Sequence, residues 1–265
     1  MSPLSYLEFL VVFVVAPTLG LMALGGFPAR RRTPRAGLPG RRRTAGVGLA
    51  IMIVAALVYT IPWDNYLIGQ GVWWYGESVV ALRLGLMPIG EYSFIIAQSC
   101  LAAAWLYRLE WPDRVRLAPD WTRSLTTAGL LALTVAGVGL LAWQRTYYLG
   151  AILAWGAPVI ALQTAVGAHY LLGAPRFVAT AVLVPSVYLW AIDHLAIGWG
   201  LWVISPAHTT GLTLLGLPIE EAIFFLLTDA MVVQGLVLFH WVVETRRYEW
   251  LVDRWRKVRV VPAWR

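Results

Sequence analysis

The sequence predicts an all-α integral membrane protein of about seven transmembrane helices, with two parallel three-helix repeats joined by a linker helix. Of the 265 residues, 59% are hydrophobic and only 13% are charged, a balance more apolar than a soluble domain of this length usually has. Apolar runs long enough to cross a bilayer recur along the chain, and the last three match the first three. Lipid is therefore the expected solvent for most of the surface.

Seven apolar runs have the length of roughly 17 to 25 residues that spans a membrane as a helix. They occupy residues 4–24, 46–62, 86–107, 125–143, 148–168, 177–196 and 217–243. No basic residue precedes the first run and no small-residue cleavage pattern follows it. We therefore expect the first run to be kept as a helix rather than removed as a signal peptide.

The basic residues indicate how the runs are oriented. Of the 21 Lys and Arg residues, 19 lie in segments that fall on one side of the membrane, and only Arg83 and Arg145 fall on the other. By the positive-inside rule, the N-terminus lies outside and the C-terminus is cytoplasmic, which predicts a multi-pass protein of the cell (cytoplasmic) membrane. The net charge of +7 is spread between the runs, so we expect it to meet anionic membrane lipid and no nucleic acid.

An internal repeat organises the chain. Three pairs of segments match, namely Ala16-Pro17 with Ala157-Pro158, residues 64–73 with 193–202, and residues 86–91 with 216–221. The predicted division is a first repeat at 1–108, a linker with the fourth span at 109–146, a second repeat at 147–243, and a basic cytoplasmic tail at 244–265. Because the linker crosses once, both repeats have the same orientation, and a ligand site is expected between them.

Carboxyl groups recur at one end of both repeats. Asp64 and Asp193 follow the runs that lead outward. Glu91 and the pair Glu220-Glu221 begin the runs that lead back, so all are expected at one depth. A glutamate in the first turn after a proline is also an ordinary helix start, where it complements the helix dipole. An aspartate at a helix C-terminus is unfavourable, which leaves solvent contact or a function to explain it.

The two copies are not equivalent. Gly90 stands where the second copy has Glu220, and Ser99 stands where it has Asp229. Two adjacent carboxyls repel unless one holds a proton. Asp229 lies roughly 12 Å deeper along its helix than Glu221, and it must be neutral, paired or functional there. These differences favour the second copy as the one that carries the groups for proton transfer.

Polar and aromatic neighbours of the carboxyls are further candidates for the site. Asn65 and His194 each follow an aspartate and are candidates to orient it or share its proton. The four histidines have no ligand-like spacing, so no metal site is predicted. Most of the 15 tryptophans are expected to form an interfacial belt. The alternative for Trp73 and Trp202, which lie near the acids, is that their faces stabilise a cation.

The most specific motifs resemble a known family. Pro-Trp-Asp-Asn-Tyr at 62–66 and Pro-Ile-Glu-Glu-Ala-Ile-Phe-Phe at 218–225 are similar to the lycopene cyclase domain family of non-flavin membrane cyclases, in which two units occur as a heterodimer or fused. Copy one departs from the motif with Pro-Ile-Gly-Glu at 88–91. The resemblance implies conversion of the linear ends of lycopene, or a related linear carotenoid, to β-rings. It implies no net redox change and no cofactor, and it makes other carotenoid-pathway enzymes candidate partners.

The resemblance also suggests roles for the carboxyls. Glu220 or Glu221 would be the acid that protonates the substrate, kept protonated by burial and by its like-charged neighbour. The other three carboxyls would act as base or cation stabilisers: Asp64, Asp193 and Glu91. The expected substrate-binding residues are Asn65, His194, Trp73, Trp202, Phe94, Phe224 and Asp229. The alternative is a small-solute carrier with the same 3+1+3 plan, which needs several hydrogen-bonding side chains at mid-depth, and the sequence has few.

Overall fold

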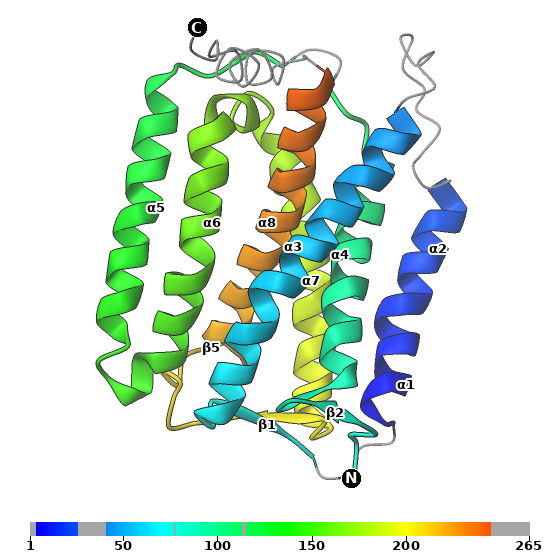
Figure 1. The fold of residues 1–265 in the computed structure, drawn as a ribbon, viewed down its shortest axis with the longest axis vertical. Coiled ribbons are helices and arrows are strands. Elements are labelled where there is room, and N and C mark those ends of the chain that lie inside the picture. The colour runs from blue at the N-terminus through cyan, green and yellow to red at the C-terminus, as the bar shows by residue number, and fades with distance from the viewer. Residues whose placement is uncertain (1–3, 26–40, 77, 113–114, 245–265) are drawn as a thin grey trace, which may run out of the picture.

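The computed structural model describes residues 4–25, 41–76, 78–112 and 115–244. Within these residues, seven helices are long and apolar enough to cross a membrane, and they stand side by side as a bundle (Figure 1). This confirms the predicted fold class. The basic tail expected after residue 244 and the arginines expected at 30–35 lie outside the described residues.

The first span consists of three consecutive helical segments, the fifth begins with a short 3₁₀-helix and is kinked at Gly167, and each of the other spans is one helix. The helices are α1 (Tyr6–Leu10), the π-helix η1 (Val11–Val15), α2 (Ala16–Gly25), α3 (Arg41–Gly69), α4 (Ile89–Arg108), α5 (Trp121–Leu140), the short 3₁₀-helix η2 (Gln144–Thr146), α6 (Tyr147–Leu171), α7 (Pro175–Gly198) and α8 (Ile219–Glu244). Short strands occupy the connections at one end: β1 (Trp73–Tyr75), β2 (Arg83–Leu84), β3 (Met87–Pro88), β4 (Trp202–Ile204), β5 (Thr213–Leu214) and β6 (Leu217–Pro218).

Helix α3 is longer than the apolar run that predicted it. The run ends at residue 62, whereas the helix continues to Gly69 with Pro62 inside it. Pro62 has no amide proton to donate to the Val58 carbonyl, but a membrane helix tolerates the loss of one such hydrogen bond. Nearer the end of α3, the Asn65 side chain donates to the Ile61 carbonyl at 2.9 Å. Asp64 therefore lies within the last turns of α3, as Asp193 does within α7.

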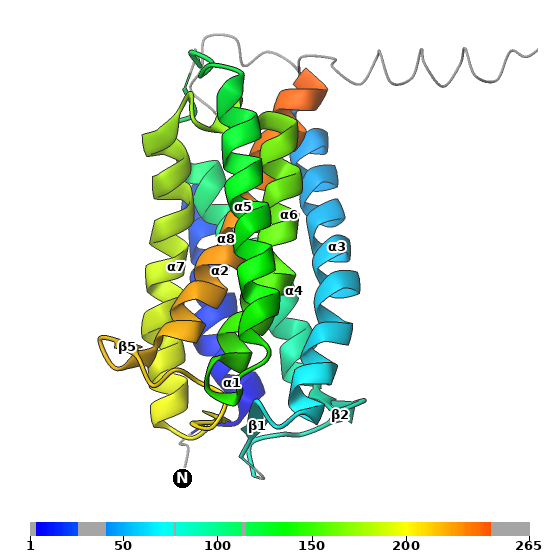
Figure 2. The ribbon, with the colours of Figure 1, turned by 90° about the vertical axis from the view of Figure 1, so that its left-hand side faces the viewer.

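Helix α8 is the centre of the bundle, with α3, α4, α6 and α7 packed around it. Helix α5 packs mainly on α6 and leaves its other faces at the periphery (Figure 2). Glycines set the spacing of that pair, because a Cβ on Gly137 would lie 2.7 Å from the Ala154 nitrogen and one on Gly150 would lie 2.7 Å from the Gly137 carbonyl. Small residues at helix contacts let membrane helices approach closely.

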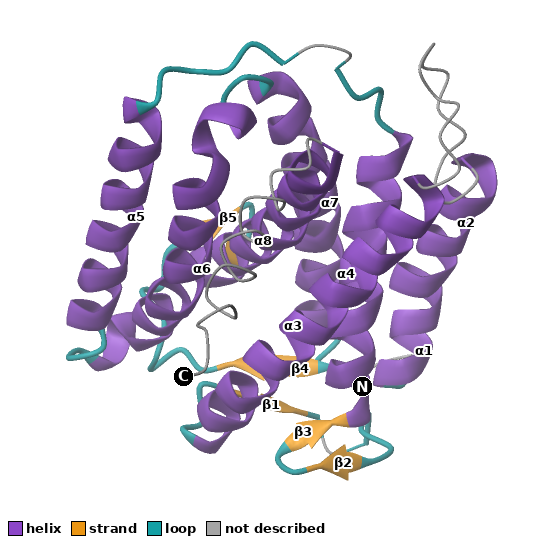
Figure 3. Ribbon diagram, turned by 45° about the horizontal axis from the view of Figure 1, so that its top comes forward, coloured by secondary structure: helices purple, strands orange, loops and turns teal. Residues whose placement is uncertain are grey.

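A two-stranded sheet joins the two halves at the end where the chain enters α1 (Figure 3). Strand β1 pairs antiparallel with β4, with Trp73 opposite Ile204 and Tyr75 opposite Trp202. Equivalent hydrogen bonds continue on both sides, from the Gly76 amide to Leu201 at 3.2 Å and from the Ser205 amide to Val72 at 2.8 Å. The sequence did not lead us to expect these strands, which fix the halves against each other beside the carboxyls.

The beginning of the first span corresponds to the beginning of α6. The Tyr6 amide donates to the Val79 carbonyl at 3.1 Å, and the Tyr148 amide donates to the His208 carbonyl at 3.1 Å. The two acceptors are 129 residues apart, the same spacing as Trp73 and Trp202 in the paired strands. Tyr6 and Tyr148 therefore hold the same place in the two halves.

The π-helix η1 explains how this correspondence survives a difference in length. Tyr6 stands ten residues before Ala16, whereas Tyr148 stands nine residues before the matching Ala157. A π-helical turn accommodates one extra residue within a helix and is often found at functional sites. By absorbing that residue at Val11–Val15, the first span restores the direction of the Tyr6 side chain.

Candidate active site

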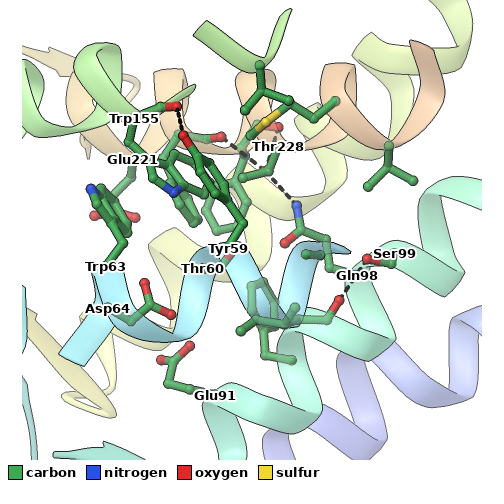
Figure 4. A pocket seen from close by; sticks show the side chains of 18 of the residues that line it. Tyr59, Thr60, Trp63, Asp64, Glu91, Gln98, Ser99, Trp155, Glu221 and Thr228 are labelled. Atoms are coloured by element: carbon green, nitrogen blue, oxygen red, sulfur yellow. Dashed lines mark hydrogen bonds between the residues drawn. The ribbon is translucent and has the colours of Figure 1, made fainter. Parts of the chain in front are cut away.

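A cavity of about 390 Å³ lies between the two halves, next to the β1–β4 sheet (Figure 4). Its volume falls within the range of small-molecule sites. Helices α3, α4, α6 and α8 supply most of the wall, and β1 and β4 contribute Trp73, Trp202 and Ile204. Most of the lining is aliphatic or aromatic, and its charged groups are all carboxyls.

Four acidic side chains reach this one cavity, as the sequence led us to expect. They are Asp64 on α3, Glu91 on α4, Asp193 on α7 and Glu221 on α8. Figure 4 shows the Asp64 and Glu91 carboxyls facing each other. Asp64 is close enough to Glu91 and Glu221 for electrostatic repulsion, and Asp193 is close enough to the same two glutamates.

No basic side chain is among the described residues that line the cavity. Asp64, Asp193 and Glu221 are 4%, 2% and 5% exposed, so water cannot offset their charges. Several buried carboxylates without a counter-ion are too costly to coexist. The cluster therefore holds at least one proton, and the hydrogen bonds indicate where.

In the first half, Glu91 is surrounded by donors. The Tyr75 hydroxyl donates to Glu91 Oε1 at 2.6 Å, and Trp73 Nε1 donates to the Tyr75 oxygen at 3.0 Å. The Tyr6 side chain also interacts with Glu91. Burial and the nearby Glu91 carboxyl hold the pKa of Tyr75 well above its usual value, so this hydroxyl keeps its proton and remains a donor. Glu91 is thus well satisfied as a carboxylate, which only accepts hydrogen bonds.

In the second half, Glu221 has fewer partners. Ile204 takes the position that Tyr75 has in the first half and offers no hydroxyl. Trp202 Nε1 donates to Asp193 Oδ1 at 3.0 Å, and Glu221 interacts with Tyr148. Each of these two carboxyls also has a buried oxygen without a partner, Asp193 Oδ2 and Glu221 Oε1. A buried carboxyl with an unpaired oxygen is better accommodated with a proton than as an anion.

Glu220 does not reach the cavity, although the sequence offered it as the acid alongside Glu221. Its Oε1 accepts hydrogen bonds from the Thr210 amide at 2.7 Å and the Thr210 hydroxyl at 2.8 Å, so it anchors the segment before β5. Consecutive residues of a helix do not face the same way. Its counterpart Gly90 has a separate explanation, because a Cβ there would collide with the Tyr6 ring.

Asn65 and His194 also lie outside the cavity lining. Asn65 Oδ1 accepts from the Leu86 amide at 2.9 Å and so holds the β2–β3 turn. His194 is exposed, and its ring lies against Gly216 in the β5–β6 turn, where an added Cβ would approach to 2.9 Å. Each residue supports a hairpin and does not line the cavity that the aspartate before it reaches.

Asp229 is fully buried behind the cavity wall rather than on it. Its Oδ2 lies 2.9 Å from the Ser186 hydroxyl, and its Oδ1 lies 3.4 Å from Gln98 Nε2. The Ser186 oxygen also lies 2.9 Å from the Val182 carbonyl, which has no proton to give. Since one hydroxyl carries one proton, both bonds form together only when Asp229 donates. This network is complete with a neutral Asp229.

Aromatic rings form one side of the cavity. Trp63 stacks on Trp155 with ring centroids 4.6 Å apart and planes inclined by 21°, and it lies parallel to Phe224 at 5.9 Å. Phe94, expected from the sequence, lines the cavity as well. Sequence reasoning missed Tyr6, Tyr148 and Tyr75. The first two match between the copies once a one-residue insertion is allowed, whereas the counterpart of Tyr75 is an isoleucine, Ile204, so the repeat gave no signal for it.

The amide side chains in the cavity do not favour the carrier alternative. Gln98 Nε2 binds Thr228 Oγ1 at 2.7 Å and Gln163 Nε2 binds the Met231 carbonyl at 2.8 Å. Both donor groups are therefore already engaged within the protein. Besides the carboxyls, the buried polar atoms of the lining that remain without a partner among the described residues are Trp155 Nε1 and Gln163 Oε1.

Comparison with known proteins points to one family. The lycopene cyclase family model matches residues 40–109 and 144–242. A lycopene beta-cyclase from Halobacterium salinarum is 47% identical over 255 residues, which cover 95% of this chain and 99% of that relative. A bifunctional lycopene cyclase/phytoene synthase from Colletotrichum graminicola is 36% identical over 202 residues, covering 71% of this chain and 34% of that protein. A protein of the same name from Aspergillus niger is 33% identical over 211 residues, covering 76% and 36%. No solved structure matches. The chain belongs to the lycopene cyclase family.

Proposed function

We propose that this chain is a membrane enzyme that converts the linear ends of lycopene, or a related linear carotenoid, to β-rings by proton-initiated cyclisation. The observation that carries the proposal is the set of four carboxyls converging on one apolar, aromatic cavity without a basic residue in its described lining. The name of the Halobacterium relative agrees with this reaction. The chemistry needs one proton donor, one proton acceptor and no redox partner.

Glu221 is the proton donor in this mechanism. Its proton adds to the terminal double bond of the substrate and creates a tertiary cation. The neighbouring double bond attacks that cation, which closes the ring and moves the positive charge onto a ring carbon. The stacked faces of Trp63, Trp155 and Phe224 lie along the cavity and stabilise the cation, and the exclusion of water prevents its capture as an alcohol.

Glu91 is the base that removes a ring proton and leaves the ring double bond. Its hydrogen bond from Tyr75 favours the ionised state before the reaction. Asp64 interacts electrostatically with both Glu91 and Glu221, so it is suited to return the proton from the base to the acid. One proton enters the substrate and one leaves it, so the net reaction is an isomerisation. Asp193, held by Trp202, stabilises the cation.

We further propose that the carboxyl end of the bundle faces outward. Arg83 and Arg145 lie at the end with the acids, whereas Arg108, Arg123 and Arg176 lie at the opposite end of their helices. The positive-inside rule then places the N-terminus outside and the C-terminus in the cytoplasm of a cell-membrane protein. Protease digestion of sealed right-side-out vesicles, followed by detection of a tag at each terminus, tests this orientation.

The division into repeats also belongs to this proposal, with units at 1–108 and 147–243 and a linker at 109–146. The family match omits residues 110–143, and the β1–β4 sheet takes one strand from each unit. Both observations support an ancestral duplication around a linker helix.

Production of the protein in bacteria that accumulate lycopene tests the reaction. We expect pigment analysis to show β-ring products with the wild-type chain. Loss of a general acid typically costs about 10²- to 10⁴-fold in rate, so Glu221→Gln should leave mainly lycopene. Glu220→Gln distinguishes the two adjacent glutamates. Loss of product with that variant and full product with Glu221→Gln would transfer the donor role to Glu220 and refute the assignment from the cavity.

A further inference from the structure

An opening in the wall of the cavity lies between α3 and α6. Among the residues that line the cavity, three are exposed at the protein surface: Ala55, Tyr59 and Leu162. Tyr59 is 43% exposed and Leu162 is 67% exposed. All three belong to α3 or α6, so the exposure is confined to one gap in the helix bundle.

The position of these residues determines what the opening faces. Ala55 and Leu162 lie within the spans Thr44–Gly69 and Gln144–Leu171. Ala55 precedes Asp64 by nine residues, which places it about 13 Å farther from the carboxyl end of the bundle. At that depth the surroundings of a membrane protein are hydrocarbon, so the opening faces lipid.

Packing of the described residues closes two other routes into the cavity. The β1–β4 sheet lies across the carboxyl end, where Tyr6 and Trp73 are 2% and 7% exposed. Beyond the opening, toward the other end of the bundle, α3 packs against α8, since a Cβ on Gly48 would lie 2.8 Å from the Phe239 ring. A ligand that reaches the carboxyls therefore passes the rim formed by Ala55 and Leu162.

Tyr59 forms the edge of the opening nearest the acids. Its hydroxyl donates to the Trp155 carbonyl at 2.9 Å, and its ring stacks on the Trp155 ring with centroids 5.5 Å apart. This contact connects α3 with α6 (Figure 4). The rim is thus apolar toward lipid and aromatic toward the reactive end of the cavity.

We infer that the opening between α3 and α6 admits the linear carotenoid sideways from the lipid and holds its unreacted polyene while one end is cyclised. The inference rests on the proposed function. A lipid-dissolved hydrocarbon never crosses water on this route, and the aqueous phase gains no path to the cation. Because this opening leads to one carboxyl cluster, one ring forms per binding event, and the far end of the molecule stays in the membrane.

Narrowing the rim tests this inference. Ala55→Trp fills the opening from α3, and Leu162→Trp fills it from α6. Val54 and Val166 are matched controls, because they are 60% and 45% exposed on the same helices and are absent from the cavity lining. Each variant is placed in phosphatidylcholine vesicles with lycopene, and kcat/KM is measured together with the thermal unfolding temperature.

We expect kcat/KM of both rim variants to fall by about tenfold or more. A tenfold fall corresponds to an activation free energy that is higher by about 1.4 kcal/mol, relative to free enzyme and substrate. Val54→Trp and Val166→Trp should stay within about twofold of wild type. The graded substitutions Ala55→Val and Ala55→Leu keep the test usable if tryptophan prevents folding. Folded rim variants that turn over lycopene like their controls would overturn the inference and assign the opening to a lipid chain alone. Failure of the proposed function differs, since the wild-type protein would then form no ring.

Discussion

Replacing Tyr75 with phenylalanine is expected to slow ring formation while the fold persists. The substitution removes the hydroxyl that donates to Glu91 at 2.6 Å and accepts from Trp73 at 3.0 Å, and it leaves the aromatic ring in place. A hydrogen bond to a charged group contributes about 1.5–3 kcal/mol. Since about 1.4 kcal/mol corresponds to a factor of ten, kcat should fall by about 10- to 150-fold.

Tyr92→Phe is the matched control for this prediction. Tyr92 follows Glu91 on α4, and its hydroxyl donates to the Leu84 carbonyl at 2.8 Å, outside the cavity lining. Both variants lose one tyrosine hydroxyl bond, but only Tyr75→Phe removes a donor from the proposed base. The assay measures kcat and KM for lycopene in vesicles, with thermal unfolding measured in parallel.

The expected result is a lower kcat for Tyr75→Phe with KM within about twofold of wild type, and an unchanged kcat for Tyr92→Phe. The KM comparison separates an effect on the base from a general distortion of the binding site. A Tyr75→Phe protein with wild-type kcat would refute the view that this hydroxyl keeps Glu91 ready as a base. Equal losses in both variants would refute it as well.

Two further predictions concern stability, measured by thermal unfolding in detergent micelles. Gly90→Ala should destabilise the protein by about 1–3 kcal/mol, because the new methyl group overpacks against the Tyr6 ring. Its control is Gly129→Ala, which should not destabilise the protein, because an added Cβ there meets nothing within 4 Å. Similar stabilities of the two variants would contradict a close contact between Gly90 and the Tyr6 ring. Asp229→Asn should retain stability within about 1 kcal/mol, since an amide can still donate to Ser186, whereas Asp229→Leu should lose about 1–3 kcal/mol. A large loss with Asp229→Asn would show that Asp229 is ionised.

The seven spans were predictable because each is a long apolar segment, and apolar length is the property that a bilayer selects. The ends were less predictable. The run before Pro62 appeared to stop at the proline, yet α3 continues to Gly69 with Pro62 inside it. A proline removes one backbone hydrogen bond from a membrane helix, and the local sequence does not show whether the folded protein tolerates that loss.

The grouping of the carboxyls also followed from the repeat, since matched turns bring Asp64, Glu91, Asp193 and Glu221 to one depth. The place of Glu220 did not follow. Its pairing with Glu221 in sequence suggested a shared site, but neighbouring helix positions point in different directions, and Glu220 binds Thr210 instead. The strands β1 and β4 were not predicted, because each has only three residues. Their tryptophans were attributed to the aromatic belt at the membrane interface.

The difference between the two halves that matters most for the chemistry lies in the paired strands. Tyr6 and Tyr148 approach Glu91 and Glu221 from equivalent positions, so the repeat alone would give both glutamates the same affinity for a proton. Two such carboxyls would have no preferred direction of proton transfer. Tyr75 in β1 breaks the equivalence, because its counterpart in β4, an isoleucine, has no hydroxyl to donate. Environments that separate the proton affinities of two carboxyls define an acid and a base. One residue of a three-residue strand is therefore sufficient to set the direction of proton transfer between the two repeats.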